Sequence, residues 1–126
     1  MDDETLSVNL LRVFCSFVKE LTTTFPEYEE CINENYNTVI DSTNFIIQDS
    51  DIMIEFMDRI NAISKNIKDK DESIFKNDAI ILTGVSFKDI WNEKLNPKTR
   101  DSIWKYLQTF CLLDVSYRAN DLLKKA

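Results

Sequence analysis

The stretch TLSVNLLRVFCSFVKELTTT, residues 5–24, decides the fold class of this chain. Its apolar side chains recur three or four residues apart, which places them on one face of an α-helix. They are Leu6, Leu10, Val13, Phe14, Phe17, Val18 and Leu21. Glu4 stands where the helix dipole favours an acid, and Pro26 disfavours helical geometry at Phe25. We therefore predict an amphipathic helix over residues 5–24.

Two more helices are predicted between residues 26 and 67. Pro26 suits the first turn of a helix, and the core face of this second helix would consist of Tyr28, Cys31, Ile32 and Tyr36. Ser50 or Asp51 can cap a third helix. Its apolar stripe consists of Met53, Phe56, Ile60, Ile63 and Ile67. Such a stripe fits either the core of this chain or a seam with a second chain, and the sequence leaves both open.

The C-terminal part of the chain predicts a short helix and a long one. Ser86 can cap a short helix that carries Phe87, Ile90 and Trp91. Asn96-Pro97 is the clearest start signal in the sequence, a capping residue followed by proline at the first helical position. That last helix would run to about Leu113 or, with a bend near Asp114, to Leu123. Residues 38–48 and 74–85 are left unassigned.

The composition supports a helical fold. The 126 residues include one Gly and two Pro, whereas an all-β chain needs turn residues about every eight to twelve positions. Eight Phe, four Tyr and two Trp supply large side chains for a packed interior. We predict the all-α class, with a compact bundle of about five helices that forms a single domain over residues 1–126.

The residue types present disfavour most enzyme classes. Without histidine, the chain lacks the commonest general base and the commonest transition-metal ligand. With one glycine it cannot form a phosphate-binding loop of the P-loop or dinucleotide type. We therefore expect no catalytic residues, no cofactor and no metal site. A carboxylate-dependent enzyme is the third alternative, with Glu30 and Glu34 or Glu55 and Asp58 as paired acids.

The sequence also predicts where the protein resides. It begins Met-Asp-Asp-Glu, unlike a secretory signal, which starts with positive charge. It holds no run of eighteen apolar residues and no Asn-x-Ser/Thr glycosylation motif. We expect a cytoplasmic protein without a membrane span.

Charge is distributed unevenly along the chain, whose net charge is −7. Residues 1–63 carry thirteen acidic and three basic side chains, while residues 64–126 carry nine acidic and twelve basic ones. Either the acidic helices lie beside the basic ones within one fold, or an acidic surface docks a basic partner protein.

Nucleic-acid binding is the second alternative, because basic and aromatic residues alternate in the C-terminal half. The basic residues are Lys88, Lys94, Lys98, Arg100 and Lys105, and the aromatic ones are Phe87, Trp91, Trp104 and Tyr106. Asp89, Glu93 and Asp101 dilute this patch, and the aromatic residues have the spacing of a helical core. We therefore rank nucleic acid below protein as a partner.

Two stretches resemble known sequences: LTTTFPEYEECI, residues 21–32, and LTGVSFKDIWNEKLNPKTRDSIWKYLQTFCLL, residues 82–113. Both are similar to parts of uncharacterised small helical proteins of nucleocytoplasmic large DNA viruses, the giant viruses. The resemblance implies a viral origin and a place in the host-cell cytoplasm or the virion. It carries no catalytic signature and assigns no functional residue.

Together these features predict a non-enzymatic module for protein–protein interaction, acting as a viral structural component, an assembly factor or a host-interaction factor. The partner would be a viral or host protein, or a second copy of the chain. An exposed tryptophan would be the first candidate for a binding hot spot. The candidate partner-binding residues are Trp91, Trp104, Lys105, Gln108, Met53 and Phe56.

Overall fold

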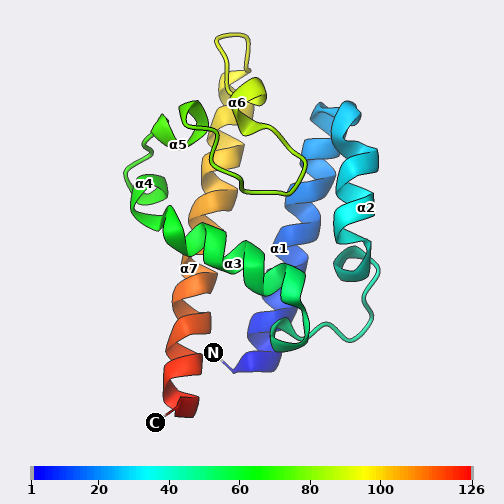
Figure 1. Ribbon diagram of the computed structural model, residues 1–126, viewed down its shortest axis with the longest axis vertical. Helices are drawn as coiled ribbons and strands as arrows, with labels where there is room; N and C mark the ends of the chain where they lie inside the picture. Colours follow the sequence, from blue (N-terminus) through cyan, green and yellow to red (C-terminus); the bar gives the residue numbers. More distant parts are fainter. Residues whose placement is uncertain (1, 126) are drawn as a thin grey trace.

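The computed structural model, shown in Figure 1, describes residues 2–125, with the backbone alone for Lys125. This part of the chain contains helices and no strand, which confirms the all-α prediction. The long helices are α1 (Asp3–Thr24), α2 (Glu29–Ile40), α3 (Asp51–Ala62) and α7 (Pro97–Lys125). The short ones are α4 (Ser64–Lys68), α5 (Ser73–Lys76) and α6 (Phe87–Ile90), with 3₁₀ turns at Pro26–Tyr28 and Ile47–Asp49. None of these helices has the length and apolar character needed to cross a bilayer.

The first helix forms where its apolar spacing predicts it. Asp2 caps α1 by accepting a hydrogen bond from the Thr5 N–H at 2.7 Å, and the acids of the first turn lie at the positive end of the dipole. The helix ends at Thr24, because Phe25 adopts φ −127° ahead of Pro26. Its inward face is fully or almost fully buried at Leu6, Leu10, Phe14, Phe17 and Leu21.

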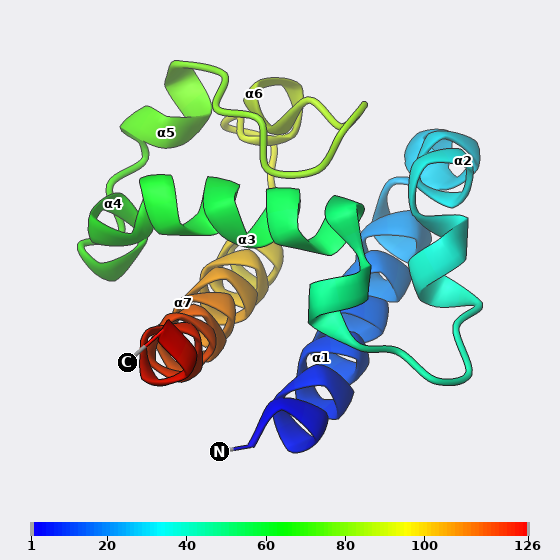
Figure 2. The same cartoon turned by 60° about the horizontal axis from the view of Figure 1, so that its bottom comes forward.

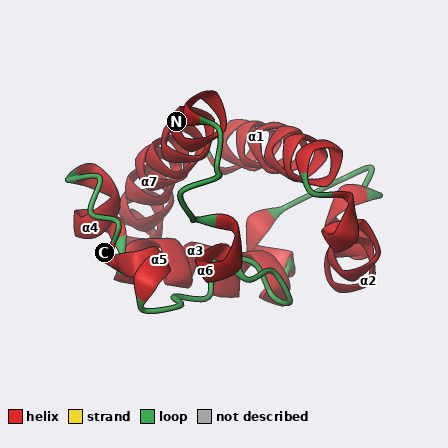
Figure 3. Cartoon of the chain, turned by 90° about the horizontal axis from the view of Figure 1, so that it is seen from above, coloured by secondary structure: helices red, strands yellow, loops and turns green. Residues whose placement is uncertain are grey.

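The long helices form two layers. α1 and α7 lie side by side and run in opposite directions (Figures 1 and 2). Ser102 near the start of α7 donates a hydrogen bond to Glu20 near the end of α1, and Asn120 near the end of α7 donates to Asp3 at the start of α1. α3 crosses this pair as a second layer, and α2 flanks α1 (Figure 3).

Aromatic rings join the two layers. Phe56 of α3 lies with its ring centroid 5.3 Å from that of Phe14 on α1 and 4.9 Å from that of Phe110 on α7, both edge to face. Phe17 contacts Phe110 at 5.5 Å. Burial of each phenyl ring contributes about 1.5–3 kcal/mol. The stripe that begins at Met53 therefore belongs to the core, the first of its two predicted roles.

The third helix is shorter than its apolar stripe predicts. Ile63 leaves helical geometry at φ −112° and ψ 13°, so that α3 ends at Ala62 and a separate α4 begins at Ser64. Ile67 is still fully buried, because the change of direction at Ile63 lets α4 lie against α7. The prediction of one continuous helix through Ile67 is therefore wrong. The residues of the stripe nevertheless pack in the core or against it.

The last helix is continuous through the whole C-terminal segment. Asn96 caps it by accepting a hydrogen bond from the Lys98 N–H at 2.8 Å, which confirms the predicted start. α7 then runs to Lys125, beyond both of the predicted ends. Of the two unassigned segments, residues 38–40 complete α2 and residues 47–48 lie in a 3₁₀ turn, while residues 74–76 belong to α5 and residues 77–85 form a loop.

That loop is fixed by close contacts around the only glycine. The Thr83 N–H donates to the Tyr36 hydroxyl at 2.8 Å, and Arg59 donates to the Thr83 hydroxyl at 2.9 Å. Gly84 has φ +83°, and a Cβ atom there would lie 2.1 Å from Cys31 Sγ. Glycine is required here by both its backbone conformation and the thiol beside it.

We expect Gly84→Ala to lower the free energy of unfolding by roughly 2–4 kcal/mol, because it adds backbone strain and a steric clash. In a Cys31→Ala background the same change should cost only about 1–2 kcal/mol, since the clash is gone and the left-handed conformation remains unfavourable. Urea denaturation of the four proteins measures this coupling. Equal costs in the two backgrounds would show that the thiol does not restrict position 84.

Candidate functional site

Three of the predicted partner-binding residues lie in the core. Met53 is 0% exposed, Phe56 1% and Trp104 5%. Trp104 contacts Phe75 at a centroid distance of 5.2 Å. These side chains stabilise the fold and present almost no surface to another molecule.

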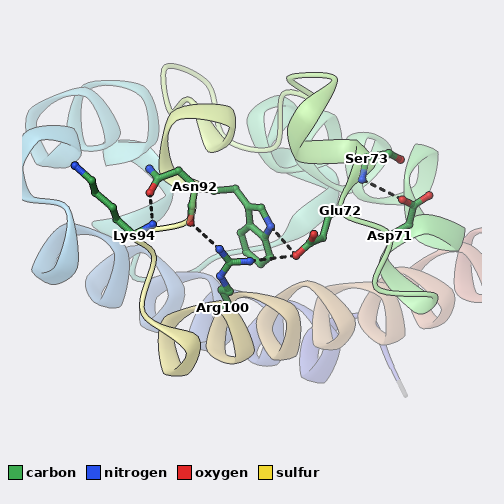
Figure 4. Close-up of polar contacts among 7 residues, drawn as sticks. Asp71, Glu72, Ser73, Asn92, Lys94 and Arg100 are labelled. Carbon is green, nitrogen blue, oxygen red and sulfur yellow. Dashed lines mark hydrogen bonds and ion pairs between the residues drawn. The ribbon is translucent and has the colours of Figure 1, made fainter.

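Trp91 is partly exposed, but its own chain holds it on both sides. Its ring stacks on Phe75 at a centroid distance of 4.1 Å, and the Arg100 guanidinium lies 5.3 Å from the ring centroid. Its Nε1–H donates to Glu72 at 3.0 Å. Figure 4 shows how Arg100 reaches both Glu72 and the backbone carbonyl of Asn92. Trp91 thus closes the end of the core near α5 and α6.

Of the four aromatic residues in the predicted nucleic-acid patch, two are buried and two, Trp91 and Tyr106, are partly buried against their own chain. Phe87 is fully buried, Trp104 is nearly so, and Tyr106 packs on Phe17 at 5.1 Å. Single-stranded nucleic acids bind through bases stacked on exposed rings. The exposed lysines of the predicted nucleic-acid patch are separated along the chain by acidic residues.

The paired carboxylates form no acid-lined cleft in the described residues. Glu55 pairs with Arg59, and Asp58 pairs with Arg118. Glu30 and Glu34 lie on the exposed side of α2. Within residues 2–125, three or more potential metal-ligating side chains do not come together anywhere.

The outer side of α7 borders an open groove. α4 lies beside α7 in both Figure 1 and Figure 2, and the two helices and the end of α3 enclose an open groove of about 480 Å³. We call this the α4–α7 groove. Its lining consists of Asn61, Ser64, Lys65, Ile67, Lys68, Gln108, Cys111, Leu112, Asp114 and Val115. Of the predicted residues, Gln108 lines it, and Lys105 is exposed one turn away on α7.

Exposed apolar side chains begin in this groove at Leu112 and Val115 and continue along α7 beyond it. Leu112 is 72% exposed, Val115 67% and Leu122 69%. With the exposed Ala119 between them, they are separated by three, four and three residues, the spacing of a helix-packing seam. We call these four residues the α7 stripe. They lie on a different side of α7 from Ile103, Leu107 and Phe110, which face the core.

The sequence contains the signal for this stripe, which our prediction did not use. Between residues 103 and 123 α7 carries two apolar sets out of phase with each other. Either set could have been the core face, and only the position of α1 and α3 distinguishes them.

A buried carboxylate lies at the inner side of the groove. Asp114 is 3% exposed and accepts hydrogen bonds from Arg118 Nε at 3.0 Å to each oxygen. Arg118 also donates to Asp58 at 2.9 Å and to the Met57 carbonyl, so it ties α7 to α3. Burial raises the pKa of Asp114, and the hydrogen bond from Arg118 partly opposes this rise. Burial also raises the pKa of Cys111 to about 11, so its thiol is protonated at neutral pH.

Comparison with known proteins gives no match to a family model, a curated protein or a solved structure. The function is therefore inferred from these residues and their geometry.

We expect Arg118→Met to lower the free energy of unfolding by about 2 kcal/mol at pH 7, because the Asp114 carboxylate stays buried without its donor. Losing Arg118 raises the folded-state pKa of Asp114 further. Below the ordinary pKa of 3.8 the carboxyl is protonated in both the folded and the unfolded state, so its burial does not lower the free energy of unfolding there. As the pH rises toward the raised folded-state pKa, the unfolded state ionises first and the free energy of unfolding falls. The deficit should therefore be smaller near pH 4 than at pH 7.

Urea denaturation of wild type and variant at the two pH values measures this difference. In the control, Asp114→Asn combined with Arg118→Met, the deficit should not grow between pH 4 and pH 7, because the carboxyl with the raised pKa is absent. A deficit of the same size at both pH values in the single variant would contradict the assignment.

Proposed function

We propose that this chain, as a single helical domain, is a non-enzymatic interaction module that binds another protein through the α4–α7 groove. The observation that carries this proposal is the α7 stripe, where Leu112, Val115 and Leu122 are each about two-thirds exposed. A contiguous exposed apolar strip beside a groove is the usual mark of a protein-binding surface.

The position of the stripe supports binding of a helix in particular. Its residues repeat with the spacing that matches the side chains of a second helix, and an amphipathic helix in an apolar groove is a recurrent mode of recognition. Cys111 extends the apolar surface into the groove, and the buried Ile67 lies beneath it. Covering this surface removes apolar area from water, which is the main source of affinity in such contacts.

We further propose a viral setting, with the protein in the host-cell cytoplasm or in the virion as a structural, assembly or host-interaction factor. The resemblance of residues 21–32 and 82–113 to giant-virus proteins supports this setting. The binding surface itself does not depend on it, because the α7 stripe lies mostly outside those two stretches.

We expect Leu112→Asp combined with Val115→Asp to abolish partner binding, because two charges would have to be buried at the contact. The control is Ile80→Asp, which also replaces an exposed apolar residue (60% exposed) but lies outside the groove. Quantitative affinity capture from infected-cell lysate should recover at least one protein with wild type and with the control. The same protein should be depleted more than about tenfold with the double variant.

Circular dichroism and light scattering complete this test. Both variants should keep the wild-type helix content, since the substituted side chains are exposed. The proposal fails if the double variant still recovers the same proteins, or if wild type recovers none and is a monomer by light scattering.

A further inference from the structure

The charges around the α4–α7 groove are opposite in sign to the net charge of the chain. The chain carries −7, but the exposed charged side chains that line the groove are Lys65 and Lys68. Neither lysine forms an ion pair with a side chain of the described residues. They are three residues apart on α4, so they lie on the same side of that helix.

The one acid in the lining does not offset these lysines. Both oxygens of Asp114 accept from Arg118, and the carboxylate is 3% exposed. Asp58, the other acid of this network, pairs with Arg118 outside the groove lining. The opposite wall, formed by Gln108, Leu112 and Val115, carries no charge. An occupant therefore meets an apolar wall on α7 and positive charge on α4.

The length of the surface matches a helix of about four turns. From Gln108 to Leu122 α7 rises about 21 Å at 1.5 Å per residue. An occupant of that length can place apolar residues at the three- and four-residue spacing of the α7 stripe. Its side chains toward α4 would then lie within reach of Lys65 and Lys68.

A second copy of this chain offers one helix with an exposed apolar stripe, α7 itself, and its exposed charged residues between 105 and 124 are Lys105, Asp121 and Lys124, which do not make an acidic flank. The acidic helix α2 carries Glu29, Glu30 and Glu34 on its exposed side, but its buried apolar residues face the core. Among the described residues outside α7, the large exposed apolar side chains are Val8, Ile46 and Ile80, which lie on separate elements. An occupant that brings both an apolar stripe and acidic flanks therefore comes from another protein.

We infer that the α4–α7 groove binds an amphipathic helix of a different protein in which acidic side chains flank the apolar stripe. This inference rests on the proposed function and adds the chemistry of the partner. The apolar contact supplies most of the affinity, and the two lysines select acidic over basic flanks.

The test uses a displayed library of helical peptides of about 18 residues, long enough to span the groove. Leucines are fixed at the spacing of the α7 stripe, and the flanking positions are randomised among Glu, Gln, Ser and Lys. Selection on the wild-type protein, after removal of peptides that bind Leu112→Asp/Val115→Asp, should enrich Glu on the flank. The enriched peptide is then measured by fluorescence anisotropy against purified variants.

Lys65→Glu combined with Lys68→Glu should weaken the enriched peptide about tenfold, because two favourable charge contacts become repulsive. It should also improve binding of the same peptide with Lys in place of Glu. The matched control is Lys88→Glu with Lys94→Glu, which changes the net charge equally at exposed lysines outside the groove. Its affinity should stay within about twofold of wild type, because long-range effects are screened.

Three outcomes would overturn the inference. First, the selected peptides could carry Gln, Ser or Lys on their flanks and still require Leu112 and Val115 for binding. This result would contradict an acidic partner but leave the proposed function intact. A dimer in sedimentation equilibrium that Leu112→Asp/Val115→Asp dissociates would show that a second copy covers the groove. Failure to enrich any peptide that depends on these two residues would count against the inference and the proposed function together.

Discussion

The structure depends on the contact of Phe56 with Phe14 and Phe110. These three rings join α3 to α1 and α7 at centroid distances of 5.3 and 4.9 Å. A pair of antiparallel helices cannot enclose a core, so α1 and α7 need a third element across them. Once Phe56 fixes α3, the turn at Ile63 places α4 beside α7. The α4–α7 groove is therefore a consequence of how the core is closed.

The same constraint explains why α7 has an apolar stripe facing outward. α1 and α3 cover one face of α7, at Ile103, Leu107 and Phe110. Phe75 of α5 and Trp91 pack on Trp104 near the start of the helix, and the short α4, which ends at Lys68, adjoins its middle. Asp114 and Arg118 lie on α7 between the face that contacts α3 and the face that borders the groove. The buried ion pair is tolerated there because Arg118 satisfies both carboxylate oxygens.

Local sequence signals predicted where most helices begin, whereas contacts between residues far apart in the sequence determine the loop paths and the groove. The caps at Asn96 and Ser86 are confirmed by hydrogen bonds to the Lys98 and Asp89 N–H groups, because a cap acts within one turn. The path of residues 41–50 depends on the buried Ser7 hydroxyl, which accepts from the Ile47 N–H forty residues away. No local pattern encodes such a contact. For the same reason the sequence named Gln108 and Lys105 as candidate binding residues but could not identify the groove.

The charge imbalance between the two halves is resolved only in part within the fold. Asp3 pairs with Lys124 and Asp58 with Arg118 across the halves, while the acids of α2 remain exposed. An acidic helix approaching the groove is thus repelled by the chain as a whole and attracted by Lys65 and Lys68 at contact. At physiological ionic strength the Debye length of about 8 Å screens the distant acids more than the adjacent lysines. The local charges of the groove, more than the net charge of the chain, therefore determine which partner fits.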